Sequence, residues 1–88
     1  MVAAMRLKVD AVEWREFEGE VVALDVVASE YLSANKAGAV LWRELAGGAT
    51  REQLTAALAS RFSIDETAAA GDVDRFLTAL RSRDLLDE

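Results

Sequence analysis

Residues 31–42 read YLSANKAGAVLW, and within this stretch the pattern changes from that of a strand to that of a helix. Residues 30–34 form a short run that predicts a strand. Asn35 follows, and its side chain is of the type that accepts from the free N–H groups at a helix start. The apolar residues after it then recur at the spacing of one helical face, at Ala37, Val40, Leu41 and Leu45. The stretch therefore predicts that a strand ends, and the first helix begins, near Asn35.

The residues before this junction predict further strands. Val12 and Trp14 alternate with polar neighbours, and the run 21–24 is apolar and rich in β-branched residues. Glu18-Gly19 lies between these segments and fits a turn. Leu7 and Val9 also alternate with polar residues, which indicates an additional strand near the N-terminus.

The residues after the junction predict two more helices. Gly47 and Gly48 end the first helix, because glycine adopts the left-handed capping conformation without a Cβ penalty. Thr50 and Gln53 have the spacing of a capping box, which starts the second helix. A third helix begins between residues 63 and 66, and Leu85-Leu86 folds back over the core. The two apolar stripes consist of Leu54, Ala57, Leu58 and Phe62, and of Val73, Phe76, Leu77 and Leu80.

This order of elements predicts an α+β fold of the winged helix-turn-helix-like kind. A three-stranded antiparallel sheet comes first, and three helices follow. A chain of 88 residues has room for one modest core, so residues 1–88 are expected to form a single domain, with residues 1–4 as a loose N-terminus.

Composition excludes several classes of function. The formal net charge of −6 opposes binding to nucleic acid and to anionic membranes. The absence of Cys and His excludes thiol and imidazole catalysis and metal sites built from these residues, and we expect no cofactor. The apolar runs are far shorter than the roughly 20 residues of a membrane span. Residues 1–6 also lack the pattern of a secretory signal, so a cytoplasmic protein is expected.

The stretch 31–42 resembles the PqqD family, whose members carry an aromatic pair, Leu-Asn, Gly-Ala and then a Trp. The residues that match are Tyr31, Asn35, Gly38, Ala39 and Trp42. Leu32 stands where a second aromatic residue is common, and Ala34 where Leu is common. The resemblance continues through residues 48–50, 72–77 and 84–86, and it covers nearly the whole chain after about Met5.

The resemblance implies a recognition element for ribosomally synthesised peptide natural products. In the family, the leader segment of the precursor adds as a strand to the third strand and lies in a groove against the third helix. Stand-alone members present the precursor to tailoring enzymes, and the versions of lasso-peptide pathways, which work with a leader peptidase and a cyclase, are similar in length. The resemblance thus implies an adaptor and not an enzyme.

An unpaired strand edge offers N–H and C=O groups to an extended peptide, and side-chain pockets must then supply specificity. Ala79 is small enough for a peptide backbone to approach, Arg75 and Arg83 suit leader carboxylates, and Asp72 suits a leader Lys or Arg. The candidate peptide-binding residues are Glu30, Tyr31, Leu32, Ser33 and Ala34 on the strand, and Asp72, Arg75, Phe76, Ala79, Leu80 and Arg83 on the helix.

Several of these residues also have a purely structural interpretation. The stripe containing Phe76 and Leu80 is first of all a core stripe, and Tyr31 suits cross-strand packing. Trp14 and Trp42 are expected in the core, and Gly38 suits close packing of helix on strand. Asp72 and Arg75 are equally typical of a solvated surface.

Two other functions remain open from the sequence. A winged-helix DNA-binding regulator would use the same elements, although the second helix carries only Arg51 and Arg61. The second function is that of an accessory subunit, which stabilises a biosynthetic enzyme without binding peptide itself. Carboxylates at i and i+2, such as Asp72 and Asp74, point apart on a helix and do not favour catalysis.

We expect a monomer or a weak dimer.

Overall fold

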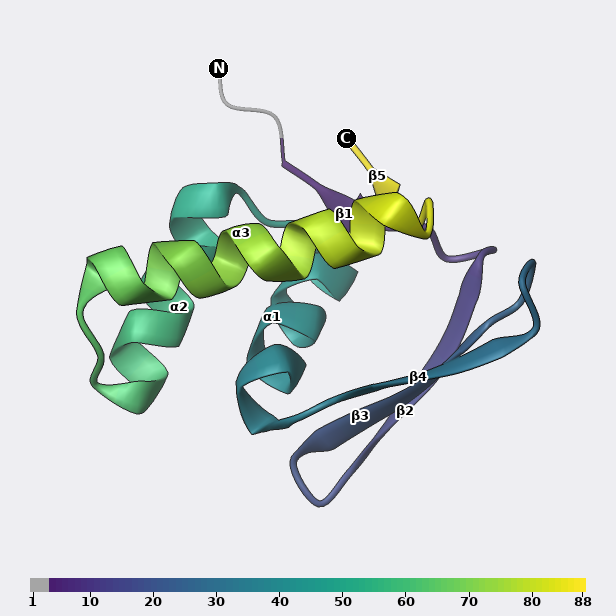
Figure 1. The fold of residues 1–88 in the computed structure, drawn as a ribbon, viewed down its shortest axis with the longest axis horizontal. Coiled ribbons are helices and arrows are strands. Elements are labelled where there is room, and N and C mark those ends of the chain that lie inside the picture. The colour runs from purple at the N-terminus through teal and green to yellow at the C-terminus, as the bar shows by residue number, and fades with distance from the viewer. Residues whose placement is uncertain (1–3) are drawn as a thin grey trace.

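Three antiparallel strands followed by three helices form the fold of the computed structural model, which describes residues 4–88 (Figure 1). The predicted α+β order is therefore confirmed. Residues 1–3 of the predicted loose N-terminus lie outside the described residues. The elements of the main sheet are β2 (Val12–Phe17), β3 (Glu20–Asp25) and β4 (Glu30–Ala34), and the helices are α1 (Lys36–Gly47), α2 (Arg51–Phe62) and α3 (Glu66–Ser82).

The additional N-terminal strand exists, but it does not join the main sheet. It is β1 (Arg6–Leu7), and it pairs antiparallel with β5 (Leu86–Asp87), so the two ends of the described chain lie side by side (Figure 1). Leu85 and Leu86 are buried, as predicted for a segment that folds back over the core. Val9, by contrast, lies in the turn after β1 and is 76% exposed, so it does not continue the strand.

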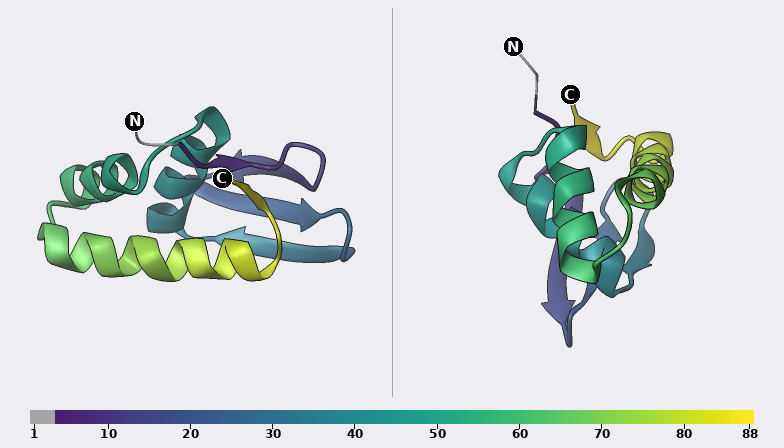
Figure 2. Two further views of the ribbon diagram at one scale, coloured as in Figure 1. Left: turned by 90° about the horizontal axis from the view of Figure 1, so that it is seen from above. Right: turned by 90° about the vertical axis from the view of Figure 1, so that its left-hand side faces the viewer.

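The main sheet has the order β2-β3-β4, and its helices all lie on one side (Figure 2). Glu18 and Gly19 form the predicted turn between β2 and β3 with φ values of 53° and 80°. Positive φ at both positions is typical of a two-residue hairpin turn, whose twist matches that of the strands. Val21 and Ala23 are buried beneath the helices, whereas Val22 between them is exposed. We call the side of Val21 the inner face and the side of Val22 the outer face.

The helices begin where their capping residues predict. The Asn35 side chain accepts from the Gly38 N–H at 2.9 Å, and Thr50 and Gln53 form both bonds of the capping box. Gly48 has a φ of 93° at the end of α1. The predicted stripes of α2 and α3 are buried at Leu54, Leu58, Val73, Leu77 and Leu80. Phe62 differs, since it is the last residue of α2 and remains 39% exposed.

Gly38 allows α1 to approach both β4 and α3. A Cβ at this position would lie 2.9 Å from the Ala34 Cβ and 3.4 Å from the Phe76 Cε1. The close packing predicted for this glycine is therefore present, and it sets the position of the end of β4 against the helices.

Replacing Gly38 with valine is expected to destabilise the protein by about 1–3 kcal/mol, because the neighbouring Ala34 is held by the strand and cannot rotate away. Gly47→Ala is the matched control in the same helix, since a Cβ there would meet nothing within 4 Å. It should be neutral or stabilising by up to about 1 kcal/mol. Urea unfolding followed by circular dichroism measures both. Equal stability of the two variants would show that the close approach is unimportant.

Candidate functional site

The free edge of β4 is the centre of the candidate site. Within residues 4–88, β4 pairs with β3 alone, so its second edge has no strand partner. The backbone groups on that edge follow from the sheet register. The Val26 N–H donates to the Ala11 carbonyl at 2.9 Å, which extends the β2–β3 ladder by one pair. Since bonded pairs alternate along an antiparallel ladder, Leu24 and Val22 face β2 with their N–H and C=O groups.

The alternation fixes which groups of β4 are free. Residues 21, 23 and 25 of β3 must direct their backbone groups toward β4, where their partners are Ala34, Leu32 and Glu30. Tyr31 and Ser33 therefore direct their N–H and C=O groups to the open edge. An extended peptide beside β4 would pair with these two residues.

The side chains of β4 are divided between the two sheet faces. Glu30, Leu32 and Ala34 lie opposite inner-face residues of β3, and Leu32 and Ala34 pack against the core. Tyr31 lies opposite Leu24 on the outer face and is 78% exposed. Its side chain is therefore available for contact and is not enclosed by cross-strand packing.

Helix α3 lies beside the free edge of β4, and its C-terminal half runs along that strand in Figure 2. The Arg83 Nη1 lies 3.2 Å from the Glu30 Oε1, which joins the end of the helix to the start of the strand. Near the other end of β4, Phe76 lies beside Gly38 and contacts Trp42 edge to face, with ring centroids 6.5 Å apart. Phe76 and Arg83 therefore lie on the side of α3 that is turned toward β4.

The predicted row of Asp72, Arg75, Ala79 and Arg83 is exposed on this side of α3. Asp72 and Arg75 form an ion pair within the helix, so the charges expected to meet a leader already have partners. Phe76 is half-buried at the border of the core and the row. Leu80 is only 4% exposed, so it offers almost no surface to a ligand and belongs to the core.

The opposite side of α3 is held against α2. The Arg51 guanidinium donates twice to the Asp74 carboxylate, at 2.7 and 2.9 Å. These hydrogen bonds hold the pKa of Asp74 below its usual value. Asp72 and Asp74 thus point to different neighbours, as their spacing predicts. Within residues 4–88 no group of three or more acidic side chains is arranged to hold a metal ion.

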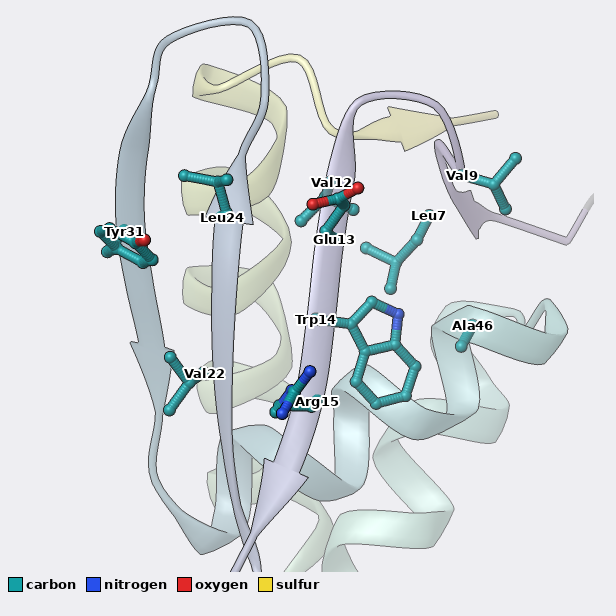
Figure 3. A pocket seen from close by; sticks show the side chains of 10 residues that line it. All are labelled: Leu7, Val9, Val12, Glu13, Trp14, Arg15, Val22, Leu24, Tyr31 and Ala46. Carbon is teal, nitrogen blue, oxygen red and sulfur yellow. The ribbon is translucent and has the colours of Figure 1, made fainter.

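The structure corrects the expectation for Trp14 and reveals a surface that the sequence analysis did not select. Trp42 is buried as predicted, but Trp14 is 38% exposed and packs edge to face on Trp42. It lines a hollow of about 760 Å³ beside β2, which extends over outer-face residues of β3 and β4 (Figure 3). The sequence signal for the outer part of this surface was the alternation of residues 12–17, which places Glu13, Arg15 and Phe17 together on the outer face.

Across residues 4–88, none of the helices has both the length and the apolar character required to cross a membrane.

Both the sequence and the fold of this chain are similar to those of known proteins. Residues 20–86 match the family described as "Coenzyme PQQ synthesis protein D (PqqD)", and this span contains every predicted peptide-binding residue. No curated protein matches the sequence. Among solved structures, the chain is similar to TbiB1 in complex with the TbiA(beta) leader peptide. The sequence identity is 28% and the TM-score 0.84, over 93% of this chain and 94% of that chain.

Proposed function

Because this chain belongs to the PqqD family, we propose that it binds the leader segment of a ribosomally synthesised precursor peptide and presents it to processing enzymes. The observation that carries the proposal is the similarity of this chain to TbiB1 in complex with a leader peptide, which extends over almost the full length of both chains. The proposed role is that of an adaptor and not of a catalyst.

The proposed binding mode is strand addition at β4. The leader runs along the free edge and pairs its backbone with Tyr31 and Ser33, whose N–H and C=O groups face outward. Main-chain pairing provides affinity with little dependence on sequence. Specificity then comes from the side chains that flank the edge, which are Leu32 and Phe76 as apolar contacts and Ala79 as the point of close approach.

The charges beside the edge favour particular leader side chains. Arg83 is bound to Glu30 and Arg75 to Asp72, and all four side chains are at least one-third exposed. A leader carboxylate can replace Glu30 or Asp72 at its arginine, while a leader Lys or Arg can join the same carboxylates. Each exchange replaces one exposed ion pair with another, so it changes which leader sequences bind more than how tightly they bind.

The proposed partners are a leader peptidase and a cyclase, as in a lasso-peptide pathway, and the proposed place of action is the cytoplasm, where ribosomes make the precursor. Binding to DNA is less well supported. Helix α2 is the element that a winged-helix regulator would use for recognition, and one of its two arginines, Arg51, is bound to Asp74.

The proposal is tested by titrating a fluorescent leader peptide with the purified protein and following anisotropy. The peptide is taken from the precursor gene nearest in the genome, and a scrambled peptide of the same composition is the control. We expect saturable binding with a dissociation constant below about 1 μM, lost on scrambling. A flat curve with folded protein, or equal binding of both peptides, would contradict leader recognition.

A further inference from the structure

A second hollow, of about 480 Å³, lies at the end of the sheet where β4 begins. It is lined by residues 8–11 around the turn after β1, by Asp25 and Val27 beside the loop between β3 and β4, and by residues 83–85 and Asp87 after α3. The C-terminal end of α3 and the β3–β4 loop lie at the same end of the molecule (Figure 2). Because Arg83 of this lining binds Glu30, the hollow adjoins the free edge of β4. We call it the end hollow.

Asp25 contributes a buried carboxylate to the end hollow. It is 3% exposed, and within residues 4–88 it is the one polar or charged residue that is buried. Its Oδ1 accepts from the Ala28 N–H at 3.1 Å, whereas its Oδ2 has no hydrogen-bond donor from the same part of the chain. The Oδ2 atom is not sealed off, since the only enclosed side-chain polar atom without a partner there is the Trp42 Nε1. The free oxygen of Asp25 therefore faces the hollow that this residue lines.

The loop after β3 does not account for the charge of Asp25. An asparagine would accept the same hydrogen bond from the Ala28 N–H through its side-chain oxygen. A carboxylate buried without a cation is unfavourable, because burial removes the water that would otherwise solvate its charge. A cation in the end hollow would pair with this carboxylate.

The other charges around the end hollow also favour a cation. Three of its carboxylates belong to no ion pair among the described residues, namely those of Asp10, Asp25 and Asp87. Its two basic residues already have partners, because Lys8 is bound to Asp84 and Arg83 to Glu30. The hydrogen bond to Asp84 raises the pKa of Lys8 above its ordinary value, and the charges of Asp84 and Asp87 raise it further. A positive charge is therefore stabilised at this place.

The lining of the end hollow suits a long organic cation and not a metal ion. Its carboxylates do not converge, since no group of three or more acidic side chains in the described part of the chain is placed to hold a metal. Val9 and Val27 are 76% and 85% exposed, and neither belongs to the core. Apolar walls beside separate carboxylates fit a Lys or Arg side chain, whose aliphatic stem packs on apolar surface while its charged group binds acceptors.

The proposed path of the leader passes this place. The leader pairs with Tyr31 and Ser33, and a leader that continues past Tyr31 next meets Glu30 and Arg83. Glu30 lies directly opposite Asp25 in the sheet register, so the start of β4 and the buried carboxylate are neighbours. The part of the leader that leaves the free edge at this end therefore lies beside the end hollow.

We propose that the end hollow binds a Lys or Arg side chain of the leader, just beyond the segment that pairs with β4. Asp25 accepts from the charged group, Asp10 and Asp87 add acceptors at the rim, and Val9 and Val27 contact the stem. This inference rests on the proposed leader binding and deepens it. Strand pairing depends little on sequence, whereas the end hollow selects one basic residue and thereby fixes the position of the leader along β4.

The test compares Asp25→Asn with Glu44→Gln. Asparagine keeps an acceptor for the Ala28 N–H and removes the charge, and Glu44 is an exposed acid of α1 outside the end hollow. The fluorescent label is attached to the N-terminal amine of the leader, so that only side chains supply positive charge. We expect Asp25→Asn to weaken leader binding about tenfold and Glu44→Gln to stay within about twofold, as measured by anisotropy.

The leader side chain is identified by replacing each Lys and Arg of the leader with Met in turn. One replacement should weaken binding to the unmodified chain about tenfold and binding to Asp25→Asn less than about twofold, because both changes remove the same interaction. The double variant Asp10→Asn/Asp87→Asn is the second test. Both residues are exposed, so the fold should survive, and we expect a loss of about threefold.

The possible failures are distinguishable. Absence of leader binding by the unmodified chain would remove the proposed function. Equal leader affinity of the unmodified chain and a folded Asp25→Asn chain would overturn the end hollow alone, and so would a leader in which no Lys or Arg replacement matters. Equal losses in Asp25→Asn and Glu44→Gln would assign the effect to the overall charge and overturn the site. If circular dichroism shows Asp25→Asn unfolded, unchanged affinity of Asp10→Asn/Asp87→Asn overturns it.

Discussion

Replacing Ser33 with proline is expected to weaken leader binding by about a hundredfold or more. Ser33 is one of the two β4 residues whose backbone groups face the open edge. Proline removes the N–H, leaves a leader carbonyl without its donor, and places a ring where the incoming strand must lie. The fold should survive, because proline is tolerated on the free side of an edge strand. Anisotropy titration of the labelled leader measures the loss.

Ser33→Ala is the matched control, because it removes the hydroxyl and keeps the N–H. It should bind leader within about threefold of the unmodified chain, since pairing uses the backbone. Leu32→Pro provides the converse test. The Leu32 N–H faces β3, so this change should break the sheet ladder and lower stability, which thermal unfolding would detect. Normal leader binding by a folded Ser33→Pro chain would exclude strand addition at β4.

The elements themselves were predictable because their signals are local. The Thr50–Gln53 capping box, the Asn35 cap and the Glu18-Gly19 turn each require only neighbouring residues, and each is present. Apolar alternation and helical spacing then assigned the buried faces. The pairing of β1 with β5 was not predictable in this way, since it joins residues about 80 positions apart and each strand has only two residues.

The candidate site was predictable in outline, and its details depend on the sheet register. The sequence places residues 30–34 on a strand, but it does not say which of them direct backbone groups outward. The direction of these backbone groups follows from the two-residue turn between β2 and β3. The turn sets which residues of β3 bond to β2, and the remaining residues of β3 then bond to β4. The Glu30–Arg83 ion pair spans 53 residues and likewise depends on how α3 lies against the sheet. Leu80 was expected to reach a ligand, and its burial follows from the same packing.

The exposure of Trp14 illustrates a further limit of pattern reading. Alternation places Trp14 on the inner face with Val12, and Trp14 was expected in the core. Val12 is 4% exposed, but Trp14 on the same strand is 38% exposed, although the Trp42 ring packs against it edge to face. Face assignment follows from a period of two, whereas burial depends on which other parts of the chain cover each position of that face.

Replacing Ala79 with tryptophan is expected to lower leader affinity by roughly a hundredfold while leaving the fold intact. Ala79 is exposed on α3 in the row that ends at Arg83, whose ion pair with Glu30 turns this side of the helix toward β4. A large ring there would fill the space that the leader backbone must enter. Because the position is exposed, the ring enters no packed core, and the midpoint of thermal unfolding should move little. The anisotropy titration measures the change in affinity.

Thr78→Trp is the control for that experiment, since it adds the same ring one residue earlier. Thr78 is exposed and lies one turn from Asp74, on the side of α3 that Asp74 and Arg51 hold toward α2. It should retain leader affinity within about threefold. Equal loss in the two variants would mean that bulk anywhere on α3 disturbs the protein. Loss in Thr78→Trp alone would place the leader on the other side of the helix, whereas loss in Ala79→Trp alone locates it between α3 and the edge of β4, where Tyr31 and Ser33 offer their backbone groups.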